Sequence, residues 1–369
     1  MTMEEKLLKN EEKAILALRT LYRSHGYLPF KMSKFEEYEL YVRNKDFLVS
    51  DRIITFNDTN GKLMALKPDV TLSIIKNTAD CAGVKQRVYY NEYVYRVSER
   101  THQYKEIMQA GLECVGDIDA YDVFETVLLA AKSLALISDD FVLDVSHLGI
   151  LTAVLDEIGG SELFRREAAA LIAGKNRHDL EKLCIGEGMG EKQIQKLLSF
   201  IDIYGEMDQV LARLAPVCES DAAKEALGEL GALAELLRTT SYASRIRFDF
   251  SIVNDMSYYN GIVFRGFLAG ICEGVLAGGR YDKLLRRMGR KSGAIGFALY
   301  LDLLEELTDT HDGYDVDVLL LCDETTAAAQ IAETVGKLTE GGACVSVQRA
   351  IPEKLRYRRI LDLKKGEPV

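Results

Sequence analysis

Residues 87–116, RVYYNEYVYRVSERTHQYKEIMQAGLECVG, contain two long apolar runs separated by a polar segment. The runs at 87–97 and 107–116 are rich in tyrosine, valine and other residues that favour strands. The segment between them, SERTHQYKE (98–106), has the polar composition of a loop. We therefore predict two neighbouring strands joined by a polar loop, as part of an antiparallel sheet.

The sequence on either side of this pair adds further elements. Asn60-Gly61 supplies the turn that an antiparallel hairpin prefers, between RIITF and KLMAL. Apolar residues at helical spacing predict helices over 1–25, 70–77, 121–137 and about 294–307. Further strands are predicted over 141–149, 245–253, 257–267 and 271–279. The main body is thus predicted to be an α+β fold in which helices flank an antiparallel sheet.

Two changes in composition and hydrophobic periodicity divide the chain. Residues 161–240 are dominated by Leu, Ala, Glu, Lys and Arg at helical spacing, which predicts an all-helical insertion. After TDTHDGYD, the order strand, helix, strand in VDVLLLCDE, TTAAAQIAETVGKLTEGG and ACVSVQRA is typical of a right-handed parallel crossover. We predict a core domain over 1–160 and 241–310, a helical insertion over 161–240, and a small, truncated α/β domain over 311–369.

The composition narrows the class of protein. The chain has 369 residues, of which 48% are hydrophobic, and a formal net charge of -11, which disfavours long-range attraction to polyanions. Its first residues, MTMEEKLLKNEEKAIL, do not resemble a secretion signal, and no run approaches ~18 apolar residues, so we predict a cytoplasmic protein without a membrane span. The seven cysteines show no CxxC pair and no histidine at metal-ligand spacing, so we interpret them as buried or incidental thiols and predict no metal site.

Polar residues on the predicted apolar strands are the first candidates for a site, because such a position tolerates a charge only if it is paired or faces a ligand. Arg96, Gln109 and Glu113 lie on such strands, and Asp69 and Thr71 directly follow one, in LKPDVT. Gln109 and Glu113 share one face of their strand with Gly111, which leaves room above the sheet. Two acids, an amide, a hydroxyl and a guanidinium suit a small zwitterion. The alternative is a set of cross-strand ion pairs on a solvated face.

Two later stretches add aromatic residues and glycines. SIVNDMSYYNGIVF (251–264) carries the adjacent Tyr258 and Tyr259 but no cationic residue, and LAGGRYDKL (276–284) places Tyr281 after two glycines. Glycines allow a close approach of the backbone. Alone, a Gly-Gly-Arg sequence more often marks a turn than a site.

In order and approximate separation, LKPDVT, YRVSERTHQYKEIMQAGLE, SIVNDMSYYNGIVF and LAGGRYDKL resemble the signature segments of histidyl-tRNA synthetases. The resemblance covers about residues 5–307, apart from the weakly similar insertion. It implies the class II aminoacyl-tRNA synthetase fold, paired as a homodimer. It also implies that the C-terminal α/β domain is a fragment of an anticodon-binding domain.

The same resemblance suggests a role for each candidate residue. Asp69 and Thr71 match the residues that hold the amine of histidine, Gln109 and Glu113 match further histidine contacts, and Tyr259 and Tyr281, with the neighbouring Tyr258, match the imidazole pocket. Arg96 matches the arginine that meets the carboxylate and the nucleotide phosphate. The amino-acid half of a synthetase site is therefore expected to be intact.

The nucleotide half departs from the family pattern. Asn254 and Asp255 stand where synthetases have a catalytic arginine and a glycine, and Asp302 and Leu303 stand where they have a glutamate and a second arginine. Loss of these cations opposes adenylate formation, which builds negative charge on phosphorus. We therefore predict no catalytic residue and no cofactor.

A synthetase-like body that keeps its histidine pocket but lacks both arginines resembles the regulatory subunit of short-form ATP phosphoribosyltransferase. This resemblance implies a noncatalytic chain, a hetero-oligomer with the catalytic subunit, L-histidine as the effector, and no tRNA partner. One alternative is a histidyl-tRNA synthetase with an altered nucleotide site. Another is a synthetase paralogue that binds a different amino acid or serves as a scaffold.

Overall fold

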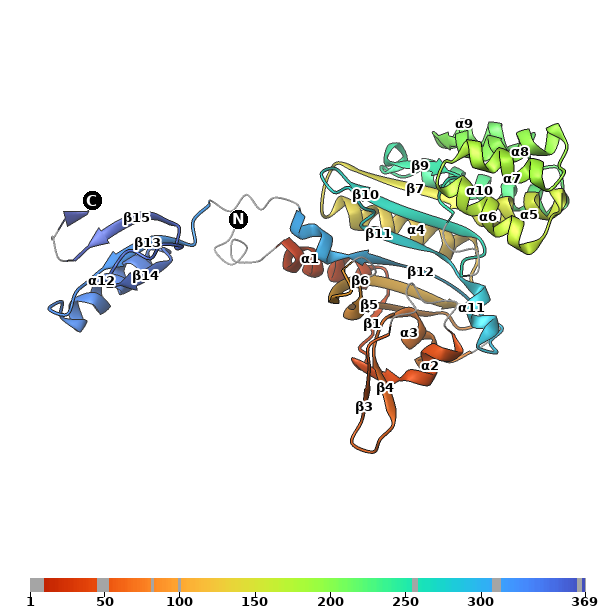
Figure 1. Cartoon of the computed structure of the whole chain (residues 1–369). Coiled ribbons are helices and arrows are strands. Elements are labelled where there is room, and N and C mark those ends of the chain that lie inside the picture. Colours follow the sequence, from red (N-terminus) through yellow and green to blue (C-terminus); the bar gives the residue numbers. More distant parts are fainter. Residues whose placement is uncertain are drawn as a thin grey trace. The chain divides into compact units, whose positions relative to one another are not determined.

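A computed structural model of the chain describes residues 10–44, 53–80, 83–98, 101–253, 258–306, 313–363 and 367–368. Residues 10–307 form one compact unit, and the described residues from 313 onward belong to another. Figure 1 shows the elements of each unit.

A nine-stranded sheet forms the centre of the first unit, in the order β1-β5-β6-β12-β11-β10-β7-β9-β8. Its strands are β1 (Leu28–Pro29), β5 (Gln86–Val97), β6 (Tyr104–Gly116), β7 (Phe141–His147), β8 (Tyr204–Gly205), β9 (Ile246–Asp249), β10 (Ile262–Leu268), β11 (Leu276–Arg280) and β12 (Gly293–Tyr300). The neighbours from β5 to β7 pair antiparallel, whereas β1 pairs with β5 and β9 pairs with β7 in parallel. The predicted antiparallel body and its pair of long strands are confirmed, and β6 begins within the predicted loop, at Tyr104.

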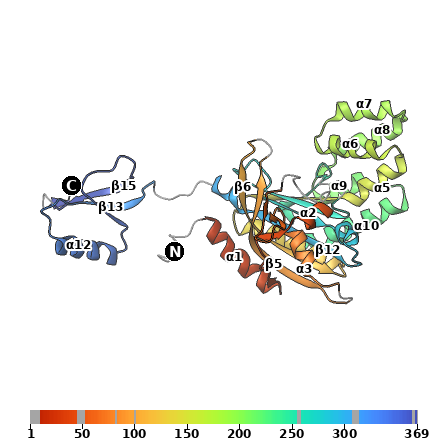
Figure 2. The same ribbon diagram turned by 60° about the horizontal axis from the view of Figure 1, so that its bottom comes forward.

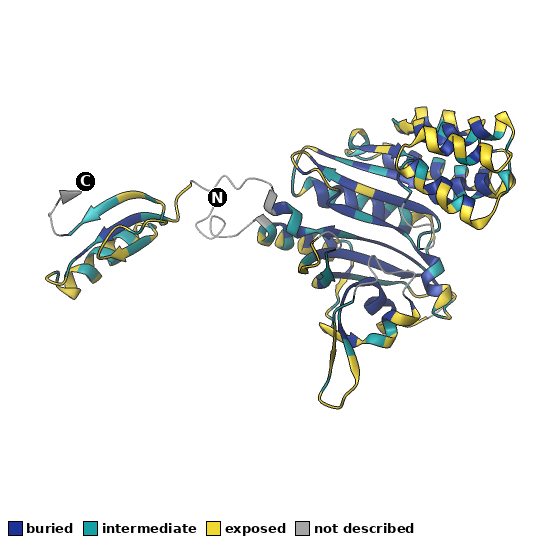
Figure 3. Ribbon diagram, in the orientation of Figure 1, coloured by how far each residue is buried: buried dark blue, intermediate teal, exposed yellow. Residues whose placement is uncertain are grey.

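Helices cover one face of this sheet. Ala110 and Leu112 of β6 are completely buried in the main apolar core with residues of α1 (Asn10–Ser24) and α4 (Ala120–Ala135). Figure 2 shows α1 beside β5 and β6, and Figure 3 shows the central strands mostly buried. Because side chains alternate along a strand, Gln109, Gly111 and Glu113 lie on the opposite face. Alternate residues of β6 therefore face the apolar core and the opposite face of the sheet.

The predicted helix over 294–307 is wrong in its first half. Residues 293–300 form β12, which pairs with β6 on one side and β11 on the other, and only Leu301–Glu306 form a short 3-10 helix, η4. The segment GAIGFALY is apolar throughout, as expected for a strand in the middle of a sheet. Its glycines and alanines also allow side chains of the neighbouring strands to pack closely against it.

The first unit also contains a small second sheet and several short helices. β2 (Phe35–Glu37), β4 (Leu63–Leu66) and β3 (Thr55–Asn57) form a small antiparallel sheet that includes the predicted hairpin. The short helices of this unit are α2 (Tyr38–Arg43), α3 (Thr71–Asn77) and α11 (Asp282–Arg287), together with the 3-10 helix η3 (Ala243–Arg245).

The predicted insertion contains α6 (Glu162–Ala173), α7 (Arg177–Gly186), α8 (Glu191–Asp202), α9 (Met207–Leu214) and α10 (Asp221–Arg238), after α5 (Leu148–Ile158). It is not entirely helical, because β8 pairs with β9 at the edge of the central sheet. Leucine-rich faces of these helices pack into the main core, which joins the insertion to the core domain.

The second unit is a four-stranded sheet in the order β14-β13-β15-β16. Its elements are β13 (Val316–Leu321), α12 (Ala328–Glu340), β14 (Val345–Gln348), β15 (Tyr357–Asp362) and β16 (Glu367–Pro368). β13 and β14 are parallel and joined through α12, which confirms the predicted strand, helix, strand unit. No helix in the described ranges is long and apolar enough to cross a membrane.

Candidate functional site

A cavity of about 390 Å³ lies on the face of the central sheet opposite α1 and α4. All eight residues predicted for the histidine site line it: Asp69, Thr71, Arg96, Gln109, Glu113, Tyr258, Tyr259 and Tyr281. Its volume is within the range of roughly 300–1,000 Å³ usual for small-molecule sites. Residues that are up to 212 positions apart in the sequence thus meet at one place, although their identity as a histidine site remains a prediction.

Glu113 is the most buried acid of the cavity, with 2% of its surface exposed. Thr71 Oγ1 donates a hydrogen bond to Glu113 Oε1 at 2.9 Å, and Tyr281 Oη donates a short one to Oε2. Burial raises the pKa of Glu113 to about 8, although both hydrogen bonds oppose the rise. The carboxyl is therefore mostly protonated at neutral pH when the cavity holds no cation.

Asp69 lies at the start of α3. Its Oδ1 accepts a hydrogen bond of 2.8 Å from the backbone N–H of Leu72, which fixes the side chain at the first turn of the helix. Burial raises the pKa of Asp69, while the Leu72 N–H and the nearby Arg96 act in the opposite direction. Arg96 Nε in turn donates to the carbonyl of Pro68 at 3.0 Å, which ties β5 to this segment. The segment LKPDVT is therefore held so that Asp69 and Arg96 line the same cavity.

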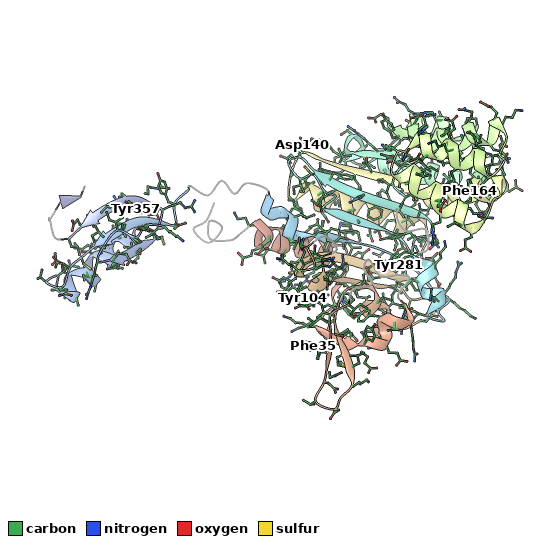
Figure 4. All side chains as sticks on the ribbon, in the orientation of Figure 1. Phe35, Tyr104, Asp140, Phe164, Tyr281 and Tyr357 are labelled. Carbon is green, nitrogen blue, oxygen red and sulfur yellow. The ribbon has the colours of Figure 1, made fainter. Side chains whose placement is uncertain are left out.

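Three tyrosines form the aromatic wall. The rings of Tyr258 and Tyr259 lie 4.6 Å apart at 60°, and those of Tyr258 and Tyr281 lie 5.6 Å apart. Tyr281, labelled in Figure 4, stands where β11 passes into α11. Burial raises the pKa of Tyr258 and of Tyr281 well above the usual value, so both phenols remain neutral hydrogen-bonding groups. Such a wall can stack on a planar ring and donate to its nitrogen.

Small residues form the floor of the cavity. Gly111 faces Ala298, and Glu113 faces Gly296, across β6 and β12. A Cβ on Gly296 would stand 1.7 Å from Glu113 Oε2 and 2.4 Å from the Leu112 carbonyl oxygen. Only glycine at this position leaves space for the Glu113 carboxyl, so the strand that was predicted as a helix shapes the site.

Gly296→Ala is expected to destabilise the protein by roughly 1–3 kcal/mol or more, because the new methyl group overlaps both a buried carboxyl and a backbone oxygen. Thermal unfolding followed by circular dichroism measures the effect. The matched control is Gly228→Ala in α10, where a Cβ meets nothing within 4 Å and alanine is the better helix former by about 0.5–1 kcal/mol. Equal midpoints for the two variants would contradict the proposed packing.

Several cavity residues were missing from the sequence prediction. They include Tyr90, Arg265, Phe297, Ala298 and Tyr300. Tyr300 faces Gln109 across β12 and β6, and it could have been placed only after residues 293–300 had been recognised as a strand. Asn254 and Asp255, which replace synthetase residues, lie outside the described residues, and Leu303 lies in η4.

Two arginines outside the cavity have partners within the chain. The basic stretch 356–365 begins with Arg356, which pairs with Asp315 at 2.8 Å, and Arg290 donates to Thr78 Oγ1 at 2.9 Å. In the described part of the chain no group of His, Cys, Asp or Glu could hold a metal ion. Six cysteines are free thiols there, and Cys81 lies outside it.

Comparisons with known proteins agree with this fold. A family model described as histidyl-tRNA synthetase matches residues 3–304. A curated ATP phosphoribosyltransferase regulatory subunit from Oceanobacillus iheyensis is 27% identical over 301 residues, which cover 81% of this chain and 74% of that protein. Several other curated relatives carry the same name.

Two solved structures have a similar fold. The structure of an ATP phosphoribosyltransferase regulatory subunit/histidyl-tRNA synthetase from Bacillus halodurans has a TM-score of 0.77 at 22% identity, covering 96% of this chain and 93% of that one. A chain of the ATP phosphoribosyl transferase (HisG:HisZ) complex from Thermotoga maritima has a TM-score of 0.63 at 18% identity, covering 79% of this chain and 97% of that one. The class II synthetase-like fold is confirmed. Because the family model spans most of its length, this chain belongs to the histidyl-tRNA synthetase family.

Proposed function

We propose that this chain is the noncatalytic regulatory subunit of a short-form ATP phosphoribosyltransferase, required for the first step of histidine biosynthesis and for its feedback regulation. The name shared by the curated relatives supports this function. The observation that carries it is a cavity with a complete set of groups for an amino acid in a chain that has Asn254 and Leu303 where the synthetase pattern has arginines. Such a site binds histidine and lacks the cations for adenylate chemistry.

L-histidine is the proposed ligand of the cavity. Its amine binds Asp69 and Thr71, its carboxylate binds Arg96, and its imidazole lies against the tyrosine wall formed by Tyr258, Tyr259 and Tyr281. Glu113, together with Gln109, accepts hydrogen bonds from the ligand's N–H groups. Each polar group of the ligand then has a partner, which the burial of the site requires.

The proposed partner is the catalytic subunit of the short-form enzyme, in a cytoplasmic hetero-oligomer in which the synthetase-like core forms a homodimer. The HisG:HisZ complex of Thermotoga maritima contains a chain of this fold, which supports such an assembly. No tRNA partner is proposed. For feedback, histidine must bind one conformation of the assembly more tightly than the other, because equal affinities shift no equilibrium.

Adding the purified chain to a short-form catalytic subunit is expected to raise the turnover of ATP and phosphoribosyl pyrophosphate, and histidine is expected to lower it again. Coupling energies of about 1–3 kcal/mol are typical of such linkage, which corresponds to roughly 5-fold to 150-fold changes. Steady-state rates with and without this chain measure both effects. An unchanged rate and no response to histidine would reject the regulatory role.

An active histidyl-tRNA synthetase with a rewired nucleotide site is the alternative. It predicts histidine-dependent exchange of pyrophosphate into ATP, whereas the regulatory role predicts no exchange above that of a protein-free control. Measuring the exchange at saturating histidine separates the two functions, because the amino-acid half of the cavity is common to both.

A further inference from the structure

His147 is a buried histidine at the junction between the central sheet and the helical insertion. It is the last residue of β7, only 3% of its surface is exposed, and α5 begins at the next residue. α10 of the insertion packs along α5 (Figure 1). A Cβ on Gly149 would stand 2.8 Å from His147 Cε1 and 3.6 Å from the Cβ of Ala226 on α10. The imidazole ring is therefore enclosed where β7, α5 and α10 meet.

Glu229 of α10 makes the hydrogen bond that holds this ring. His147 Nε2 donates to Glu229 Oε2 at 3.1 Å, and the buried Nδ1 has no hydrogen-bond partner among the residues that the structure describes. The Glu229 side chain is 56% exposed. The hydrogen bond from His147 lowers the pKa of Glu229, and the nearby charge of Arg280 acts in the same direction, so the acid is ionised at neutral pH. A buried ring thus depends on one bond to an acid that water can reach, and such a bond can open and close.

The backbone beside His147 continues into the ends of β10 and β11. β10 pairs with β7 as far as His147, and the N–H of Leu148 donates to the carbonyl of Gly261 at 2.9 Å. One residue earlier in the chain than Gly261, the N–H of Asn260 donates to the carbonyl of Arg280 at 3.0 Å. The end of β7, the residues before β10 and the end of β11 are therefore held side by side at this point.

A buried carboxylate ties these strand ends together. Asp282 is 5% exposed, and its Oδ2 accepts hydrogen bonds from Arg280 Nε at 2.8 Å and from Asn260 Nδ2 at 3.2 Å. Its Oδ1 accepts a hydrogen bond of 3.0 Å from the backbone N–H of Ala294 on β12. Both carboxylate oxygens are thus used, and the network links β11 and β12 to the residues before β10.

The tyrosine wall of the cavity stands on the same segments. Tyr281 directly precedes Asp282, and Tyr259 directly precedes Asn260. A Cβ on Gly279 would stand 2.8 Å from Tyr259 Cδ1, so this ring packs directly against the backbone of β11. A movement of these strand ends relative to one another therefore changes the wall that faces the cavity.

We propose that the hydrogen bond between His147 and Glu229 is a latch through which the helical insertion controls the order of the tyrosine wall. With the latch closed, α10 holds the end of β7, and Leu148 holds the residues before β10. When α10 moves away, water solvates the Glu229 carboxylate, whereas His147 loses its bond to the insertion and the paired strand ends loosen. The coupling is reciprocal, so a molecule that binds the wall also favours the closed latch. A partner that binds the insertion in only one of the two states therefore changes the affinity of the cavity for its ligand.

Hydrogen–deuterium exchange of the full chain, without any ligand, tests the latch. In Glu229→Ala, peptides that contain Asn260 and Tyr281 are expected to exchange about fivefold faster than in the wild-type chain, because coupling between elements typically gives changes of this size or more. The matched control is Glu225→Ala, which removes the same side chain one turn earlier on α10. Glu225 is exposed, and its substitution is expected to leave the exchange of these peptides unchanged. Helix propensity changes equally in the two variants.

Faster exchange confined to α5 and α10 would overturn the proposal, because the bond would then hold only the insertion. Unchanged exchange in Glu229→Ala, or equal acceleration by Glu225→Ala, would overturn it as well. If circular dichroism shows that Glu229→Ala does not fold, Gly149→Ala decides. Its new methyl group displaces the His147 ring while both partners are kept, so the same peptides must exchange faster, and unchanged exchange there overturns the latch. No outcome depends on which ligand the cavity binds, so the latch and the regulatory function can fail separately.

Discussion

Glu113→Gln is expected to weaken the binding of L-histidine by roughly 30-fold to 1,000-fold at pH 8. The substitution keeps the size of the side chain and one acceptor oxygen, so it can accept a hydrogen bond from Thr71 or from Tyr281 but not from both. It also removes the charge on which the proposed contacts with the ligand's N–H groups depend. Losing one partner of a buried, charge-assisted hydrogen bond costs about 2–4 kcal/mol. Calorimetric titration of the chain with histidine measures the change.

The control for this variant is Glu106→Gln, which makes the same chemical change on the same strand. Glu106 is exposed and does not line the cavity, so its substitution is expected to change histidine affinity by less than about 1 kcal/mol. Thermal unfolding of both variants shows whether the fold is retained. Similar affinities for Glu113→Gln and the wild-type chain would mean that histidine binds elsewhere, for example at a subunit interface.

The part of the site on β6 could be predicted from the sequence because a strand has a fixed period of two. Once 107–116 is recognised as a strand, Gln109 and Glu113 must share a face with Gly111, and the apolar Ala110 and Leu112 must face the core. Polar residues on an otherwise apolar strand then stand out as candidates. The structure places them in one cavity with Asp69 and Arg96.

The part of the site on β12 could not be found in this way. GAIGFALY is apolar on both faces, and alanine and leucine are good helix formers, so neither period nor propensity separates a short buried helix from a central strand. The strand is selected by pairing with β6 and β11, which is a long-range property. The requirement for glycine at 296 depends on the Glu113 carboxyl, 183 positions earlier in the chain.

Arg265 was overlooked for a related reason. A single cation on a predicted strand is usually a solvated surface residue, and the sequence does not show which face of β10 lines a cavity. Register through β11 and β12 shows that its face is continuous with that of Gly111. The short distance of 2.3 Å between Arg265 Nε and a Cβ built on Gly274 is likewise a property of the folded chain and not of the local sequence.

The affinity for histidine is expected to rise with pH, by about 15-fold between pH 6.5 and pH 8. Burial raises the pKa of Glu113 to about 8 in the protein without ligand, so the carboxyl is largely protonated below that pH. In the proposed complex the N–H groups of histidine bind the ionised carboxylate, so the proton of Glu113 must be released before the contact forms. The ionised fraction rises from about 3% to about 50% over this range, and affinity follows it by linkage.

The amine and the imidazole of histidine also titrate. The pH dependence that is due to Glu113 must therefore be separated from the pH dependence that is due to the ligand. Glu113→Gln has no carboxyl to ionise at this position, and its pH profile reports the ligand's own groups. The ratio of wild-type to variant affinity is therefore expected to rise with pH and to level off above about 8. Titrations at pH 6.5, 7.25 and 8 in buffers of different ionisation enthalpy also measure proton release directly. A constant ratio would show that Glu113 is already ionised without ligand, or that it does not contact histidine, whereas a ratio that falls with pH would show that the protonated carboxyl donates to the ligand.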